Sequence, residues 1–410
     1  MKSILQNNGV QNISVFGPGQ NPAGSNEVAQ AGGLSVPAGG IQSGQPIFET
    51  YNEALAGAGL VKISTFAKNF RPSATQSSDL NVQHSFTNSV VWQFGYVGTQ
   101  ATHLLGLFDI NPGALGSLNT PVPYTSASCA PQYSGATPAT PGNNLQCSRP
   151  YFSQFPNFSV IDEAESNLGS NYNSLQTSLR IRGLHGLTSQ VGYTWSHALD
   201  YETGLLPYVP QDPLNEHAEY GNSDFDVRNT FTGYVHYQVP SFWGPNRLSK
   251  GWELDSGFSF HGGTPYTVVS ATNPSGNGEG ADRAVQVVAS PTAGVSHAVT
   301  NGVVQWFSPT AFVDAPLNTY SPTRRGQNYN PGYSDVDLAV LKNTPITESV
   351  SAQFRVDIFN VFNHTNLAPV GLPFAAENGT IGSTLGPYLG NPSIGPGEPL
   401  HAEFSLRVLF

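Results

Sequence analysis

The strongest constraint on this chain is the alternation of apolar and polar residues in its last segment, residues 400–410. The apolar face of that segment consists of Phe404, Leu406, Val408 and Phe410. A repeat of two residues predicts a β-strand with two different faces. The same alternation runs through residues 77–86, 89–100, 172–183, 187–199, 229–240, 251–268, 333–343 and 350–363. The sequence therefore predicts an all-β chain of about nine strands, with residues 60–70 as a tenth strand or as a loop packed on the rim.

The predicted strands are long, and each has one face made almost entirely of apolar residues. Strands of soluble proteins usually have about five or six residues, whereas strands that cross an outer membrane need about 9–11. So many long apolar faces would form a very large core in a soluble sheet. A lipid-facing belt around a polar interior accounts for both faces more simply. The pattern predicts an antiparallel transmembrane β-barrel segment, open or incomplete.

The connections between the predicted strands alternate between short and long. The long ones cover residues 101–170, 200–226, 269–332 and 364–400. Counted back from the C-terminus, every long connection falls on the same rim, opposite Phe410. Barrels of the bacterial outer membrane have short periplasmic turns and long extracellular loops. The alternation therefore predicts that location, with the long connections outside the cell and lipid as a partner.

Composition excludes several other classes of protein. Only 10% of the residues are charged, against roughly 25% in an average globular domain. The net charge of −11 argues against a nucleic-acid partner, which would require a basic surface. No run approaches the roughly 20 apolar residues of a membrane-spanning helix. The N-terminus lacks the apolar core of a signal peptide, so we expect Met1 to lie inside a longer protein.

The two cysteines, Cys129 and Cys147, lie in one stretch rich in proline, glycine and serine. No CxxC motif or neighbouring histidine pair completes a set of metal ligands. We therefore predict a local disulfide in an oxidising compartment, with two unpaired thiols as the alternative.

The sequence contains no recognisable catalytic constellation, and we expect neither enzymatic activity nor a cofactor. Residues 273–283 are glycine-rich but lack the Lys-Ser/Thr pair of a phosphate-binding loop. An acidic cluster is a weak candidate for a Ca²⁺ site, against the alternative of a solvated loop. It consists of Asp162, Glu163 and Glu165.

Charged residues at other positions are assigned structural roles. At the start of one predicted strand, Asp224, Asp226 and Arg228 are expected to form an ion-paired anchor that orders the rim. Other charged residues alternate with the apolar faces and are predicted to face the barrel interior. These are Arg180, Arg182, Arg355, Asp357 and Arg407.

Six motifs, taken in order, resemble those of the Oar-like TonB-dependent transporters of the bacterial outer membrane. They begin with "VVWQFGYVGTQATHLL" and the hairpin "NYNSLQ…YTWSHALD". They continue with "EYGNSDFDVRNTFTGYVHYQVP", "GWELDSGFSFHGGTPYTV", "RRGQNYNPGYSDVDLAVLKNTPITE" and "FRVDIFNVFNHTNL". The resemblance covers residues 76–410 and leaves residues 1–75 as a loop-rich segment.

This resemblance implies a barrel of about 22 strands that is filled by an N-terminal plug and coupled to TonB. The sequence contains neither a plug nor a TonB box, so the chain is expected to be the C-terminal part of such a barrel. It also implies that barrel-assembly machinery reads the terminal strand through Phe404, Leu406, Val408 and Phe410. The expected function is energy-coupled uptake of an unidentified ligand, with TonB acting only through the absent plug. The alternative is a structural or adhesive surface protein that acts through its long loops.

Overall fold

In the computed structural model, the described residues are 61–122, 142–155, 158–202, 210–241, 247–270, 272–280, 282–297, 305–367, 374–375 and 399–410. They are strands and loops, with short 3₁₀ helices at Gln146–Ser148, Glu216–Glu219 and Pro309–Ala311. No helix within these residues is long and apolar enough to cross a membrane. Residues 1–60 of the predicted N-terminal segment lie outside the described residues.

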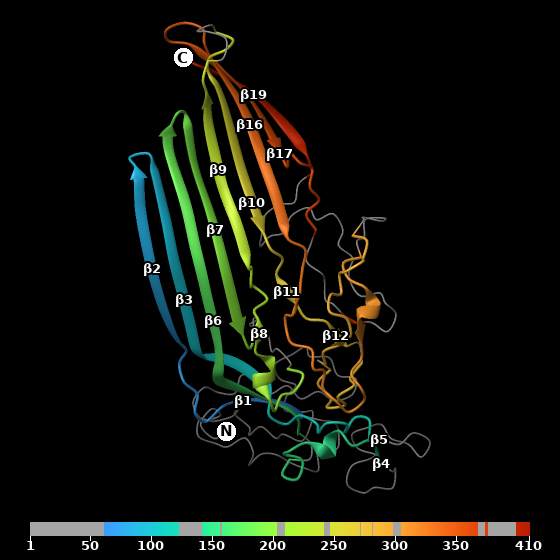
Figure 1. The fold of residues 1–410 in the computed structure, drawn as a ribbon. Helices are drawn as coiled ribbons and strands as arrows, with labels where there is room; N and C mark the ends of the chain where they lie inside the picture. Colours follow the sequence, from blue (N-terminus) through green and yellow to red (C-terminus); the bar gives the residue numbers. More distant parts are fainter. Residues whose placement is uncertain are drawn as a thin grey trace, which may run out of the picture.

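Long antiparallel strands form one curved, open sheet (Figure 1). The sheet order is β2-β3-β6-β7-β9-β10-β16-β17-β19, so each strand pairs with the next long strand along the chain. The strands are β2 (Ala74–Thr87), β3 (Val90–Asp109), β6 (Phe158–Leu184), β7 (Leu187–Asp200), β9 (Asn229–Val239), β10 (Trp252–His261), β16 (Tyr333–Pro345), β17 (Ser351–Phe359) and β19 (His401–Leu409). The predicted all-β antiparallel architecture is confirmed, and the sheet is not closed.

The short connections lie at one end of the sheet together with the C-terminus, and the long connections lie at the other end (Figure 1). The turn between β6 and β7 requires glycine at residue 186. Gly186 has φ of 85°, and a Cβ there would lie 2.6 Å from the carbonyl oxygen of Gln238. A left-handed backbone conformation favours glycine, so the tight turn depends on this residue.

The sheet differs from the sequence prediction beside the first long connection. Strands β3 and β6 have 20 and 27 residues, so the connection shrinks from the predicted residues 101–170 to residues 110–157. The pairing of β3 with β6 shifts register between Thr102 and Gly106. A β-bulge breaks the two-residue period, and the apolar residues after residue 102 therefore do not alternate.

The candidate tenth strand forms, but it is not part of the meander. Strand β1 (Val61–Phe66) pairs in parallel with the start of β6, where Ile63 lies opposite Ile161. It occupies the side of β6 that β7 occupies further along the strand. A small core holds it there, formed by Ile63, Phe158 and Ile161.

The long connections contain several short strands. These are β4 (Pro121–Val122), β5 (Gly142–Asn143), β8 (Gly221–Asn222), β11 (Pro265–Tyr266), β12 (Val269–Ser270), β13 (Val285–Gln286), β14 (Phe312–Val313), β15 (Asn328–Tyr329) and β18 (Phe374–Ala375). A second small core packs between residues 266 and 312 and includes Tyr266, Val268 and Phe307. We call the described parts of residues 110–155, 201–228 and 262–332 the loop lobe.

Candidate functional site

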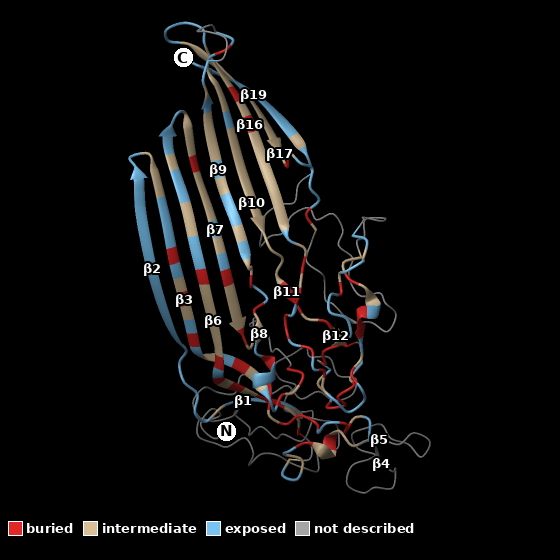
Figure 2. Cartoon of the chain, viewed as in Figure 1, coloured by how far each residue is buried: buried red, intermediate tan, exposed pale blue. Residues whose placement is uncertain are grey.

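One face of the sheet carries a broad band of exposed apolar residues, and exposed residues recur along its long strands (Figure 2). Strand pairing aligns them across the sheet, with Trp92 opposite Leu179 and Phe354 opposite Leu406. The exposed residues of this apolar band include Leu80, Val82, Trp92, Phe94, Tyr96, Leu175, Leu179, Tyr193, Trp195, Phe231, Leu254, Phe354, Phe404, Leu406 and Val408. Exposed apolar surface this extensive indicates contact with lipid or with a partner. We call this the outward face.

Aromatic residues with hydrogen-bonded polar tips mark the limits of the apolar band. Toward the loop lobe, the Tyr96 hydroxyl donates to Asn173 Oδ1 at 2.5 Å, and the Tyr193 hydroxyl donates to Asn229 Oδ1 at 2.6 Å. Toward the turns, Lys342 Nζ lies 5.3 Å from the centroid of the Trp252 ring. Rings with an apolar body and a polar tip suit a membrane–water interface.

The C-terminal strand continues the apolar band to the edge of the sheet. Phe404 pairs with Val356, and Leu406 pairs with Phe354. Their exposed fractions are 71% and 72%, because no further strand in the described part of the chain pairs with the outer edge of β19. The pairing of β19 with β17 places Phe404, Leu406 and Val408 on one face.

The opposite, inward face carries a charged cluster near the turns. His236 Nδ1 lies 2.5 Å from Asp255 Oδ1. Arg355 contacts Asp357 at 2.6 Å and Asp255 at 3.7 Å. Ala339 lies opposite both aspartates, on the strand between them. The small alanine side chain leaves room for the Arg355 guanidinium to bridge them.

A second polar row lies beside this cluster on the same face. Asn343 donates to Glu253 at 2.9 Å, and Gln353 donates to Asn343 at 2.8 Å. Arg407 lies opposite Gln353. On β6, Arg180 donates to Gln190 at 3.2 Å, and Arg182 shares its face by alternation. Strand pairing places four of the charged residues singled out in the sequence on one face, and alternation adds Arg182, while a lumen around that face remains a prediction.

The contacts between these strands were not visible in the sequence. His236 and Asp255 belong to polar faces that the alternation identified, yet their pairing depends on the register of β9 against β10. Residues Ala339 and Leu341 are apolar members of the inward face and are buried. Single-strand periodicity gave no signal for either feature.

The loop lobe is held together by buried ion pairs between distant residues. Arg325 contacts the Asp200 carboxylate and donates to the carbonyl oxygens of Asp200 at 2.6 Å and Glu219 at 2.9 Å. Arg283 contacts Glu219 at 2.6 Å, and Arg149 contacts Asp109 at 3.2 Å. Buried charges are tolerated where they are paired and hydrogen-bonded. The long connections therefore form a packed lobe, fixed to the ends of β3 and β7.

The predicted anchor at the start of β9 is present and belongs to the same lobe. Arg228 contacts Asp226 at 2.6 Å, and the Asp226 carboxylate accepts the backbone N–H of Ala198 at 2.7 Å. Arg228 also donates to the Tyr329 hydroxyl at 3.3 Å. Asp224 lies 3.7 Å from Arg325.

The half-buried Glu279 lies where two parts of the loop lobe meet, and its Oε1 atom is buried. Burial, and after it the neighbouring Asp109 carboxyl, together raise the pKa of Glu279 from 4.5 to about 8. One of its oxygens, Oε1, has no hydrogen-bond partner in the described residues. The protonated carboxyl is therefore the form that fits the folded lobe, because it can share its proton with Asp109.

The raised pKa of Glu279 predicts that the stability of the loop lobe depends on pH. Because the folded-state pKa is raised from 4.5 to about 8, the folded lobe binds more protons than the open lobe between these values. The stability of the folded lobe is highest below pH 4.5 and is lost as the pH rises through about 8. We expect the hydrogen-exchange protection of residues 272–280, corrected for the intrinsic pH dependence of amide exchange, to fall over this window, and Glu279→Gln to abolish most of that fall.

The exposed Glu348 in the turn between β16 and β17 supplies a matched control for this experiment. Glu348→Gln should leave the pH dependence of the lobe unchanged. An identical pH dependence in Glu279→Gln and the unmodified chain would contradict the assignment.

The Ca²⁺ candidate is not supported by the geometry. Asp162, Glu163 and Glu165 lie on strand β6 and not in a loop, so alternation sends Asp162 to the face opposite Glu163 and Glu165. Asp162 forms an ion pair with Lys62 at 2.9 Å. No group of three or more His, Cys, Asp or Glu residues in the described chain is arranged to hold a metal ion.

The predicted disulfide lies partly outside the described residues. Cys147 is disulfide-bonded and is half-buried in the loop lobe, while Cys129 lies outside the described residues. The pairing of Cys129 with Cys147 stays a prediction.

Comparison with known proteins places this architecture in a family. Residues 4–388 match the family model described as outer membrane beta barrel domain. No protein in a curated collection matches the chain. Among solved structures, the chain is similar to the ferripyoverdine receptor of the outer membrane of Pseudomonas aeruginosa, with 12% identity over 83% of this chain and 28% of that chain, and a TM-score of 0.38.

Two structures from Escherichia coli are similar to the same degree. The ferric-catecholate import receptor Fiu has 11% identity over 84% of this chain and 28% of that chain, with a TM-score of 0.38. The outer membrane transporter YddB has 7% identity over 89% of this chain and 36% of that chain, with a TM-score of 0.38. The chain thus spans between 28% and 36% of the lengths of these structures. Because the family match extends over most of its residues, the chain belongs to the outer membrane beta barrel domain family and is located in the bacterial outer membrane.

Proposed function

We propose that the chain forms part of the transmembrane barrel of an Oar-like TonB-dependent transporter and takes part in energy-coupled uptake of a substrate. The observation that carries this proposal is that the two faces of one sheet differ in polarity. An apolar band on the outward face suits lipid, and a hydrogen-bonded charged row on the inward face suits a polar passage. The ordered loop lobe lies at the end where such a passage would open.

The chain would contribute walls and a rim to this transport, and it would catalyse no reaction. Arg355, Asp357 and Arg407 would present charges and hydrogen-bonding groups to a polar interior. The loop lobe would hold the outer end of the wall in a fixed shape through its buried ion pairs. Energy would come from TonB acting on a plug domain that another part of the transporter contributes.

The first test is whether an assembly containing this chain binds TonB. The tagged chain would be isolated from crosslinked native membranes and probed for TonB with an antibody. We expect TonB to be recovered with the chain, and recovery to fall when Arg355→Ala and Asp357→Ala disturb the inward face. A tagged outer-membrane porin processed in parallel controls for crosslinking by proximity alone.

The alternative is a structural or adhesive surface protein that acts through the loop lobe. The packing of long connections into one ordered body favours it, because a rigid exposed surface suits a partner on another cell. Absence of TonB from the crosslinked assembly, together with weaker cell–cell adhesion after deletion of residues 272–297, would favour this function and contradict the first.

A further expectation of this proposal concerns the C-terminal strand. We propose that barrel-assembly machinery reads the apolar face of β19 and the terminal Phe410, whose exposed fraction is 99%. Deleting Phe410 should lower the amount of protein assembled in the outer membrane by about tenfold, because the contact between its exposed aromatic ring and the assembly machinery is lost. Surface labelling of intact cells measures that amount.

Phe362 offers a control for this deletion, because it is also an exposed phenylalanine but lies in a loop after β17. Phe362→Ala should leave assembly unchanged. Normal surface levels after deletion of Phe410 would rule out its role as a signal.

A further inference from the structure

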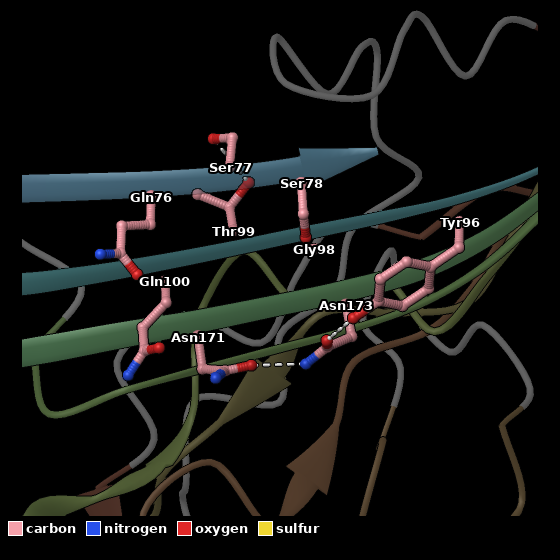
Figure 3. A pocket seen from close by; sticks show the side chains of 9 residues that line it. All are labelled: Gln76, Ser77, Ser78, Tyr96, Gly98, Thr99, Gln100, Asn171 and Asn173. Atoms are coloured by element: carbon pink, nitrogen blue, oxygen red, sulfur yellow. Dashed lines mark hydrogen bonds between the residues drawn. The ribbon is translucent and has the colours of Figure 1, made fainter. Parts of the chain in front are cut away.

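The outward face carries a polar hollow immediately beyond the apolar band. The hollow lies on strands β2, β3 and β6 and has a volume of about 530 Å³ (Figure 3). Ligand pockets usually measure about 300–1,000 Å³, so a ligand of a few rings would fit. Neither the apolar band nor the inward face accounts for this feature.

Strand pairing places most of the residues that line the hollow on the outward face, on the side nearer the loop lobe, while Ser77 and Thr99 alternate with them. One row across the three strands is Leu80, Tyr96 and Leu175, which belongs to the apolar part of the face. The next row on the same face is Ser78, Gly98 and Asn173, and the one after it is Gln76, Gln100 and Asn171. The face therefore changes from apolar to uncharged polar within two residues along each strand.

A hydrogen-bonded chain fixes one wall of the hollow. The Tyr96 hydroxyl donates to Asn173 Oδ1 at 2.5 Å, and Asn173 Nδ2 donates in turn to Asn171 Oδ1 (Figure 3). Gly98 leaves space for this arrangement, since a Cβ at that position would lie 2.7 Å from the Tyr96 hydroxyl oxygen. The Tyr96 ring thus borders the hollow at its apolar end, and the Asn171 amide nitrogen is left available to a ligand.

The remaining polar groups are also available. The side chains of Gln76, Ser78 and Gln100 make no hydrogen bond to any other described residue. Together with Asn171 they supply several donors and acceptors in one place. The lining contains no Asp, Glu, Lys, Arg or His among its described residues. The chemistry suits neither an anion nor a cation, because no opposite charge would compensate for the desolvation of either.

We propose that this hollow binds a neutral, hydroxyl-rich saccharide. Amide and hydroxyl side chains match sugar hydroxyls, which both donate and accept hydrogen bonds. The Tyr96 ring offers an apolar surface to the C–H face of a sugar ring. Because the hollow is continuous with the apolar band, the sugar of a membrane glycolipid could lie in it while the acyl chains lie along Leu80 and Tyr96. A free oligosaccharide has the same chemistry, and this proposal does not depend on transport.

The test compares matched glutamine pairs in the native assembly that contains the full chain, isolated from outer membranes in detergent or reconstituted in vesicles. One arm titrates maltotriose against the detergent-solubilised chain, followed by saturation-transfer NMR. The other arm measures binding of a diglucosyl lipid in phosphatidylcholine vesicles. The double variant Gln76→Ala/Gln100→Ala removes two amides from the hollow, and binding should weaken about tenfold or more.

The control is the double variant Gln83→Ala/Gln93→Ala, which removes the same residue type from the same two strands. Gln83 and Gln93 pair with each other on the inward face. The control should bind as the unmodified chain does. Binding in the maltotriose arm supports a free saccharide, and binding in the vesicle arm alone supports a glycolipid headgroup. Binding in neither arm, or equal weakening in both double variants, would overturn the proposal.

Discussion

Replacing Arg325 with methionine is expected to open the loop lobe while the long strands stay folded. The Arg325 side chain is 2% exposed and contacts the Asp200 carboxylate. It also donates to two backbone carbonyl groups, those of Asp200 and Glu219. Removal of one partner of a buried ion pair leaves an uncompensated charge and costs about 3–5 kcal/mol. The lobe should be destabilised by about that amount.

Hydrogen exchange of the chain in detergent measures this effect segment by segment. Residues 210–228 and 320–330 should exchange far faster in Arg325→Met, while residues 172–182 on β6 should keep their protection. The neighbouring Arg324 is exposed, so Arg324→Met removes the same charge without the buried contacts and should change little. Equal exchange in the two variants would show that the ion pairs do not hold the lobe.

The long strands were predictable because their information is local. A strand with one apolar and one polar face repeats every two residues, and that repeat is visible in residues 350–363 without knowledge of the neighbouring strands. The two rims were predictable for a related reason, since alternating short and long connections fix which end each loop occupies. The bulges of β3 between Thr102 and Gly106 interrupt the repeat, and the prediction ended the strand there.

The loop lobe was beyond prediction because its contacts are not local. Arg325 and Asp200 are 125 residues apart in the chain, and Glu219 binds an arginine from yet another part of it. No periodicity marks such pairs. The same applies to the charged cluster of the inward face, where Arg355 and Asp255 approach only after β16 has been placed between β10 and β17. Sequence patterns identified the faces, and strand order decided which side chains meet.

The two edges of the sheet lead to the second large expected effect: on its own, the chain should not form a monomeric barrel in lipid. Strand β2 pairs only with β3, and β19 only with β17, within the described residues. Every residue of β2 is exposed. Natural edge strands are often protected by proline or lysine, and neither residue occurs in β2 or β19.

The cost of leaving these edges in lipid is large. About half of the backbone N–H and C=O groups of an edge strand point away from its partner. Each unsatisfied group costs several kcal/mol in the hydrocarbon region, so the edges together would cost tens of kcal/mol. We therefore expect the chain reconstituted alone in vesicles to associate through its edges or to stay outside the bilayer. A closed eight-stranded barrel, treated in parallel, resists protease and changes its gel migration on heating. A monomer of this chain that behaved in the same way would contradict the expectation.

Because β2 and β19 run in the same direction in the meander, two copies joined edge to edge would meet at parallel seams. An all-antiparallel closure instead requires an odd number of further strands between them.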